Sequence, residues 1–302
     1  MRMTQLIMSR IALVLLLQTG AVSAQAPVST DIWLGQLNWV NEKVVIEGLR
    51  KLTDLPRYTN QPYFFDEKTL YFTQSVMMNG VDQTDIFRLD VATLQIQNLT
   101  NSQDSEYSPT PMPNNQGLSV IKVNDSGKQE LWQLNWEGNT VAHLLPGIEP
   151  IGYQVWVDDN HLMLFVLGEP HMLVKADIRD ASDSSGAVVD TNIGPSLWRI
   201  PDSDFFSYTV EELTAEETRW RLKFQHAKYN LASGVKSILL PKAGYYYAWT
   251  PQGHILTTRE GELVVNDVKT DSGFELVAGS CNTTVSRIAV SKGGKVALVC
   301  EQ

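Results

Sequence analysis

Short apolar strands separated by polar turns recur along this chain. Runs of Val, Ile, Leu and aromatic residues alternate with Gly, Pro, Asn and Asp, a pattern typical of β-strands joined by tight turns. Six of the predicted strands are apolar or aromatic and are followed at once by a polar turn. These six are Pro62–Phe65, Ser108–Pro113, Gly152–Val157, Ser196–Ile200, Tyr245–Thr250 and Val285–Val290. They recur roughly every 40 to 50 residues, which is a repeat length typical of a β-propeller.

The repeat predicts both the fold class and the number of domains. Each propeller blade is a small antiparallel sheet that needs its neighbours to bury both faces. We therefore predict an all-β, six-bladed β-propeller of four-stranded blades over residues 25–302. The length of 302 residues would by itself suggest two domains, but the repeat favours a single one.

The last repeat is incomplete at its C-terminal end. Val285–Val290 and Lys295–Cys300 supply only two strands before the sequence stops. Two unassigned strands, Asp31–Leu37 and Val44–Leu52, precede the first repeat. We predict that this N-terminal pair completes the last blade and closes the ring, which leaves only short and protected sheet edges.

The first 24 residues have the pattern of a secretory signal peptide. Arg2 and Arg10 precede the apolar run Ile11–Leu17, and small residues lead up to a predicted cleavage site after Ala24. The apolar run is shorter than the roughly 20 residues that a membrane span requires. We predict an exported protein that does not span the membrane, periplasmic in a host with an outer membrane and secreted otherwise.

The charge of the chain argues against nucleic-acid binding. The formal net charge is −10, and an acidic protein binds nucleic acid poorly because phosphate contacts need a basic face.

The two cysteines lie close to the strands of the last repeat. Cys281 stands just before the first strand of that repeat, and Cys300 ends the next strand. Export to an oxidising compartment and this placement predict a disulfide between them.

Two segments carry a resemblance to a known family. Ser286–Val299 resembles the Ser-Arg-Ile-Ala-hydrophobic-Ser-Pro-Asp-Gly-Lys repeat of the TolB-type, WD40-like exported bacterial propellers, with Lys292 and Gly293 in place of Pro and Asp. Asp85–Asp90, followed by Leu99–Thr100, resembles another part of the family's repeat, the unit Tyr-x-x-Asp-x-x-x-x-x-x-Leu-Thr. The resemblance implies a propeller fold and an exported location. Members of this family include interaction modules, sensor domains and parts of hydrolases.

The resemblance does not extend to TolB itself. TolB carries an additional N-terminal α/β domain, and the residues between Ala24 and Gln61 are too few to form one.

The sequence contains no catalytic motif. It lacks Gly-x-Ser-x-Gly, His-Glu-x-x-His, Cys-x-x-Cys and a phosphate-binding glycine loop. The histidines fall in different repeats and at different strand and turn positions, and they are His143, His161, His171, His226 and His254. We therefore predict no catalytic residue, metal site or cofactor.

The candidate binding surface is the rim of the central channel, where the innermost strands begin. The equivalent starting positions are Gln61, Pro109, Tyr153, Ser196, Tyr246 and Arg287. Aromatic and Arg side chains on a concave rim suit protein or peptide contacts. The predicted binding residues are Tyr153, Tyr246, Arg287, Tyr107, Glu106 and Arg199. The sequence is equally consistent with tyrosines that only pack between blades.

These features predict a non-enzymatic module that binds a protein or peptide of the cell envelope. Two alternatives stay open. A lactonase-like or glycan-acting propeller enzyme would need carboxylates, Asn or His converging on the axis. A carbohydrate-binding propeller would use the rim tyrosines to stack on sugars.

Overall fold

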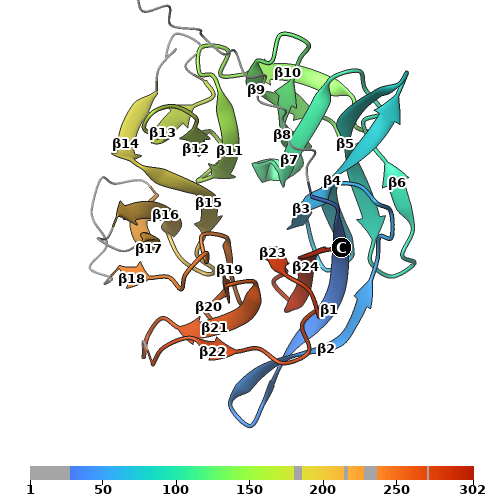
Figure 1. Cartoon of the computed structure of the whole chain (residues 1–302). Coiled ribbons are helices and arrows are strands. Elements are labelled where there is room, and N and C mark those ends of the chain that lie inside the picture. Colours follow the sequence, from blue (N-terminus) through green and yellow to red (C-terminus); the bar gives the residue numbers. More distant parts are fainter. Residues whose placement is uncertain (1–27, 180–185, 214–216, 228–236, 271) are drawn as a thin grey trace, which may run out of the picture.

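The computed structural model describes residues 28–179, 186–213, 217–227, 237–270 and 272–302 (Figure 1). The predicted signal segment, residues 1–24, lies outside these ranges. The described chain forms six four-stranded antiparallel sheets arranged as the blades of a propeller. The predicted fold class is confirmed, and each of the six predicted inner strands overlaps an observed one.

Blades one to five each use four strands that follow one another along the chain, from the channel outwards. Blade one contains β3 (Thr59–Phe64), β4 (Thr69–Met78), β5 (Val81–Asp90) and β6 (Ile96–Asn98). Blade two contains β7 (Ser105–Pro111), β8 (Leu118–Val123), β9 (Gln129–Leu134) and β10 (Thr140–Leu144). Blade three contains β11 (Ile151–Trp156), β12 (His161–Val166), β13 (Met172–Asp177) and β14 (Ala187–Thr191). Blade four contains β15 (Ile193–Arg199), β16 (Phe205–Leu213), β17 (Thr218–His226) and β18 (Ile238–Leu239). Blade five contains β19 (Tyr247–Trp249), β20 (His254–Arg259), β21 (Glu262–Asp267) and β22 (Glu275–Leu276).

Blade six joins the first and the last strands of the described chain, as the sequence predicts. Its strand order is β23 (Val285–Val290), β24 (Lys295–Glu301), β1 (Thr30–Val40) and β2 (Lys43–Lys51) from the channel outwards. The innermost strands β3, β7, β11, β15, β19 and β23 each contact the next around the ring, and β23 contacts β3. Blades three and six therefore lie on opposite sides of the channel.

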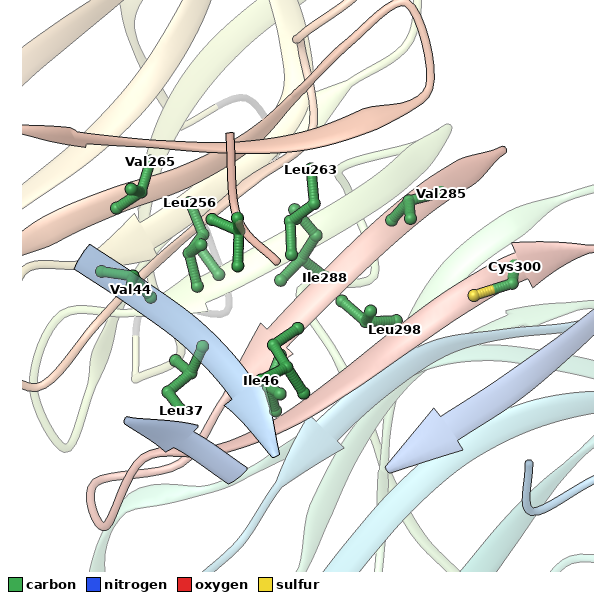
Figure 2. Packing of buried hydrophobic residues seen from close by; sticks show 13 residues of the cluster. Leu37, Val44, Ile46, Leu256, Leu263, Val265, Val285, Ile288, Leu298 and Cys300 are labelled. Atoms are coloured by element: carbon green, nitrogen blue, oxygen red, sulfur yellow. The ribbon is translucent and has the colours of Figure 1, made fainter. Parts of the chain in front are cut away.

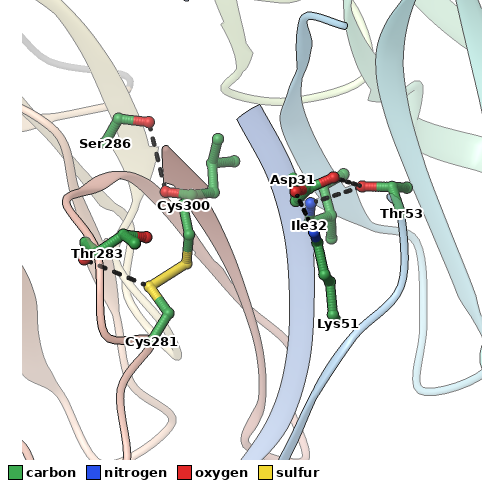
Figure 3. The surroundings of a disulfide bond; sticks show 9 residues. Asp31, Ile32, Lys51, Thr53, Cys281, Thr283, Ser286 and Cys300 are labelled. Atoms are coloured by element: carbon green, nitrogen blue, oxygen red, sulfur yellow. Dashed lines mark hydrogen bonds and ion pairs between the residues drawn. A yellow bond between two sulfur atoms is a disulfide. The ribbon is translucent and has the colours of Figure 1, made fainter. Parts of the chain in front are cut away.

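An ion pair with a buried carboxylate reinforces this closure. Asp31 of β1 pairs in register with Cys300 of β24. Its carboxylate lies 2.8 Å from the Lys51 ammonium and accepts a hydrogen bond of 3.1 Å from the Thr53 hydroxyl (Figure 3). The side-chain amide of Gln302 donates to the same carboxylate at 2.9 Å. One buried carboxylate on β1 thus holds both Lys51 of β2 and the C-terminal residue Gln302, and its charge is paired with that of Lys51.

The core lies between neighbouring blades. Leu256 and Leu263 of blade five pack in one cluster with Ile46, Ile288 and Leu298 of blade six (Figure 2). All five side chains are buried, and burying one aliphatic side chain contributes about 1.5 to 3 kcal/mol. This packing explains why a blade is stable only within the closed ring.

The predicted disulfide is present. Cys281, in the loop before β23, is bonded to Cys300 of β24 (Figure 3). The bond ties the loop that enters blade six to a strand of that blade. Within the described ranges, no helix is long and apolar enough to cross a membrane.

Candidate functional site at the mouth of the central channel

The innermost strands begin irregularly, and this sets the direction of the side chains at one end of the channel, here called the mouth. In five blades the pairing of the innermost strand with its neighbour shifts near its start. The shifts lie between Asn60 and Tyr63, Tyr107 and Thr110, Ile151 and Tyr153, Ile193 and Leu197, and Val285 and Arg287. A bulge of this kind releases a residue from the ladder and redirects its side chain.

In blade five, two residues lie outside the ladder because the innermost strand is shorter than predicted. The predicted strand begins at Tyr245, but β19 begins at Tyr247, so Tyr245 and Tyr246 lie before the ladder. Their rings contact each other, with centroids 4.5 Å apart.

Three side chains from different blades meet at the mouth, and we call Tyr153, Tyr246 and Arg287 the mouth cluster. Nη2 of Arg287 donates a hydrogen bond of 2.8 Å to the Tyr153 hydroxyl. The Tyr153 and Tyr246 hydroxyl oxygens are 3.4 Å apart. The Arg287 guanidinium carbon lies 4.0 Å from the Tyr246 ring centroid and 5.0 Å from the Tyr153 ring centroid, so both rings make cation–π contacts with it.

The Arg287 charge has no counter-charge in the described part of the chain. Arg287 takes part in none of the ion pairs there, and its one hydrogen bond is the one to Tyr153. Its Nε is buried and has no hydrogen-bond partner. A buried cation is normally paired with an anion or with several acceptors, and the half-buried Arg287 side chain, with its buried Nε, departs from that pattern.

Electrostatics keep Arg287 charged. Burial acts against the charge, but the oxygens of Tyr153 and Tyr246 outweigh it and hold the pKa of Arg287 above its usual range. Burial also raises the pKa of Tyr153, yet the Arg287 charge and the hydrogen bonds with Tyr246 and Arg287 bring that pKa below its usual value. Burial raises the pKa of Tyr246. The cluster therefore carries one positive charge at neutral pH.

The mouth cluster divides the channel into two spaces, and its three residues line both. The outer hollow has a volume of about 370 Å³, and the inner cavity has about 60 Å³. Pockets for small ligands span about 300 to 1,000 Å³, so only the outer hollow has room for more than a few water molecules.

Further aromatic and polar side chains surround the outer hollow. Tyr58, Tyr245, Asn60 and Glu301 line its wall. Arg287 is the one Lys or Arg among its described lining residues, and Glu301 is the one carboxylate. The hollow therefore combines tyrosine rings, a floor cation and a single acid on the wall.

Below the mouth cluster, polar groups in the channel are joined by hydrogen bonds. The Gln61 side-chain oxygen accepts from the Ser108 amide at 2.7 Å and from the Thr73 hydroxyl at 2.9 Å. The Gln154 side-chain amide donates to the Ser108 carbonyl oxygen at 3.0 Å. Gln61 and Ser108 have backbone φ angles of 56° and 55°, a left-handed conformation that is uncommon for residues other than glycine. This network links blades one, two and three beside the inner cavity.

The structure brings three of the six predicted binding residues together and separates the other three. Glu106 is only 1% exposed and lies between blades one and two, where it accepts a hydrogen bond from Ser102. Tyr107 is half-buried against the core between blades two and three. Arg199 ends β15 at the other end of the channel and donates to the Val157 carbonyl oxygen at 2.8 Å.

Sequence reasoning missed Tyr58 and Glu301 at the hollow. Tyr58 stands just before β3, outside the predicted first strand. Glu301 ends β24, whose residue Cys300 pairs with Val285 at the start of β23. The hairpin pairing of the last two strands could have placed Glu301 near the mouth, because antiparallel strands bring the end of one beside the start of the other.

Known proteins match this chain in structure only. No protein-family model matches the sequence, and no curated protein does either. A putative TolB from Agrobacterium tumefaciens aligns with a TM-score of 0.63 at 11% identity, over 92% of this chain and 99% of that one. The chain has a TolB-type propeller fold.

Two further solved structures are similar. A gluconolactonase from Xanthomonas campestris aligns with a TM-score of 0.58 at 10% identity, over 91% of this chain and 99% of that one. TolB from Acinetobacter baumannii aligns with a TM-score of 0.54 at 11% identity, over 91% of this chain. The chain spans only 64% of that TolB. Because solved structures under both names align with this chain, the propeller fold leaves the activity open.

Proposed function

We propose that this protein is an exported, non-enzymatic interaction module that binds a protein or peptide partner of the cell envelope at the outer hollow. The observation that carries the proposal is the mouth cluster on the floor of a concave, tyrosine-lined hollow. Tyr and Arg dominate binding energy at protein interfaces, and they do so where a pocket excludes water. Tyr153, Tyr246 and Arg287 are residues of these types, and they line a concave hollow.

The composition of the hollows supports binding rather than catalysis. A lactonase-like or glycan-acting site needs carboxylates, Asn or His that converge on one point. Among the described residues lining the two hollows, Glu301 is the one carboxylate, Asn60 is the one Asn, and no His is present. Export is supported by the signal-peptide pattern of residues 1–24 and by the disulfide, which persists in oxidising compartments.

Capture from envelope extract tests the proposal. The mature protein is immobilised, and bound envelope proteins are identified and quantified for the wild type and for the Tyr246→Ala and Arg287→Ala variants. Arg199→Ala is the matched control, because this Arg lies at the other end of the channel. We expect one protein to be captured by the wild type and the control and lost in both mouth variants. Equal capture by all four proteins, or selective binding of glycans on an array, would overturn the proposal.

A further inference from the structure

We infer that the outer hollow binds an acidic group of the partner peptide, with the carboxylate of that group on the Arg287 guanidinium. This inference rests on the proposed function, since it takes the hollow to be the surface that meets the partner. It adds the chemical class of the group that enters.

Arg287 has donors to spare, and they are accessible. A guanidinium carries five N–H donors in a planar fork. One of the five is used, by Nη2 toward Tyr153. Of the three guanidinium nitrogens, only Nε is both buried and without a partner. Nη1 makes no hydrogen bond within the described residues and is not fully buried, so it can meet a ligand from the space that Arg287 lines.

The rings hold the guanidinium without neutralising it. The Tyr246 and Tyr153 rings lie at 4.0 Å and 5.0 Å from its carbon, and ring faces attract a cation while leaving its charge in place. Two ring contacts fix the plane of the fork, which reduces the entropy lost when an acceptor binds. A planar carboxylate matches that fork with two parallel hydrogen bonds.

The surroundings favour a carboxylate over a phosphate. A phosphate group carries more charge and is normally met by several cations or by a row of backbone amides. Arg287 is the one Lys or Arg among the described lining residues. Glu301 lines the same hollow, and the whole chain has a formal net charge of −10. Both oppose a multiply charged anion, whereas a single carboxylate can pair with the floor cation.

The size of the hollow limits what can enter. A volume of about 370 Å³ lies near the lower end of the range for small-ligand pockets. It accommodates one or two residues of a peptide rather than a folded surface. Tyr58 and Tyr245 on the wall offer ring faces to the apolar part of such a residue. The entering group is therefore one residue with a carboxylate: either the C-terminal residue of the partner or an Asp or Glu within its chain.

Matched small probes test the inference directly. Hydrocinnamate carries a phenyl ring and a carboxylate, and hydrocinnamamide has the same shape without the charge. Binding of each to the mature protein is measured by NMR titration at low and high salt. We expect hydrocinnamate to bind at least tenfold more tightly than the amide and to weaken at high salt. Equal affinities for acid and amide, or no binding of either, overturns the inference.

Variants assign the effect to Arg287. Arg287→Gln is expected to abolish the preference for the acid, and Arg287→Lys to retain part of it because the charge stays and the fork is lost. Arg199→Gln is the control and is expected to behave as the wild type. If Arg287→Gln fails to fold, the salt dependence of hydrocinnamate binding to the wild type and its affinity for Arg287→Lys still test whether Arg287 binds the carboxylate. An Arg287→Gln protein that folds and keeps the preference contradicts the inference.

Short peptides distinguish the source of the carboxylate. Acetyl-Gly-Gly-Phe is compared with its C-terminal amide and with acetyl-Gly-Glu-Gly amide. Tighter binding of acetyl-Gly-Gly-Phe identifies a C-terminal carboxylate as the group that binds. Tighter binding of acetyl-Gly-Glu-Gly amide identifies an acidic side chain. Equal binding of all three contradicts the inference. In a further outcome, the mouth variants lose capture of the envelope protein while the wild type shows no preference for the acid over the amide. That result supports the proposed function and contradicts only the inference.

Discussion

The Arg287 guanidinium of blade six reaches across the channel and donates a hydrogen bond of 2.8 Å to the Tyr153 hydroxyl of blade three. The two residues are separated by 134 positions in the sequence and belong to blades on opposite sides of the ring. The contact therefore forms only once the ring is closed. It also fixes the Arg287 cation, which has no counter-charge among the described residues, on the floor of the outer hollow.

Removing this hydrogen bond should have a measurable but modest effect on stability. Tyr153→Phe is expected to lower the free energy of unfolding by about 1 to 2 kcal/mol, because the bond to a charged donor is lost while the ring contact remains. Chemical denaturation measures the change. Tyr246→Phe is the comparison variant, since it removes only the long hydrogen bond of 3.4 Å between the two hydroxyls and leaves the bond from Arg287 in place; we expect a smaller loss, of about 0.5 kcal/mol. Equal losses in both variants would contradict this assignment.

The disulfide should stabilise the last blade. Cys281→Ser is expected to lower the free energy of unfolding by about 3 kcal/mol, because the bond between residues 19 positions apart restricts the unfolded chain. Thermal melting with and without reductant measures the effect, which reductant should reproduce in the wild type and not in the variant. Titration of thiols in the unfolded, unreduced mature protein should detect none, and two reactive thiols per chain would rule the bond out.

The ring should open when its N-terminal strands are removed. Deleting Asp31–Leu52 removes nearly all of β1 and β2 and exposes the edge of β24, so we expect aggregation or a strongly lowered melting temperature. Ile32→Ala tests the same closure more gently. Ile32 is 1% exposed, and its truncation should cost about 2 to 5 kcal/mol. Val40→Ala, at an exposed position of β1, should change stability by less than about 0.5 kcal/mol. A deletion protein as stable as the wild type would exclude this closure.

Stability should fall as the pH rises from about 4.5 through 7. Burial raises the pKa of Glu106 to about 7, against hydrogen bonds from Ser102 and Thr100 and the charge of Lys122, while the charge of Asp85 raises it further. The folded protein thus binds the Glu106 proton more tightly than the unfolded chain does. The stabilisation from this bound proton is complete below pH 4.5 and is lost as the pH rises through 7, a change of about 3 kcal/mol.

Glu106→Gln tests the source of that slope. The variant keeps the shape of the side chain and cannot ionise, so its melting temperature should vary less between pH 5 and pH 8 than that of the wild type. Burial raises the pKa of Asp85 as well, so a residual slope of the same sign is expected. An unchanged slope in Glu106→Gln would show that Glu106 does not titrate in this range.

The fold was predictable from sequence because the signals that define it are local. A strand, its turn and its repeat length can be recognised in one segment, and the orphan strands Asp31–Leu37 and Val44–Leu52 had a single vacant blade to fill. Cys281 and Cys300 could be paired because both flank strands of that one blade. Each of these relations depends on the order of the strands and not on the direction of a side chain.

The site was only partly predictable because it depends on side-chain direction. Tyr153, Tyr246 and Arg287 converge through local irregularities at the starts of the innermost strands, and the repeat alignment placed them at equivalent positions. Glu106 begins an inner strand too, yet its side chain lies between blades. A strand alternates its side chains between two faces, so a shift of one position separates the channel from an interblade contact, and sequence alone does not set that shift.

The most direct test of the central claim, that the mouth is the working surface, is a thermal melt and a partner capture on the same three variants, Tyr153→Ala, Tyr246→Ala and Arg287→Ala. All three side chains are half-buried, so truncation should lower the melting temperature by about 10 °C or less. We predict that each variant loses the captured partner while keeping a cooperative melt near that of the wild type. Unchanged capture, or large losses of melting temperature in all three, would contradict the account and leave the cluster a packing element.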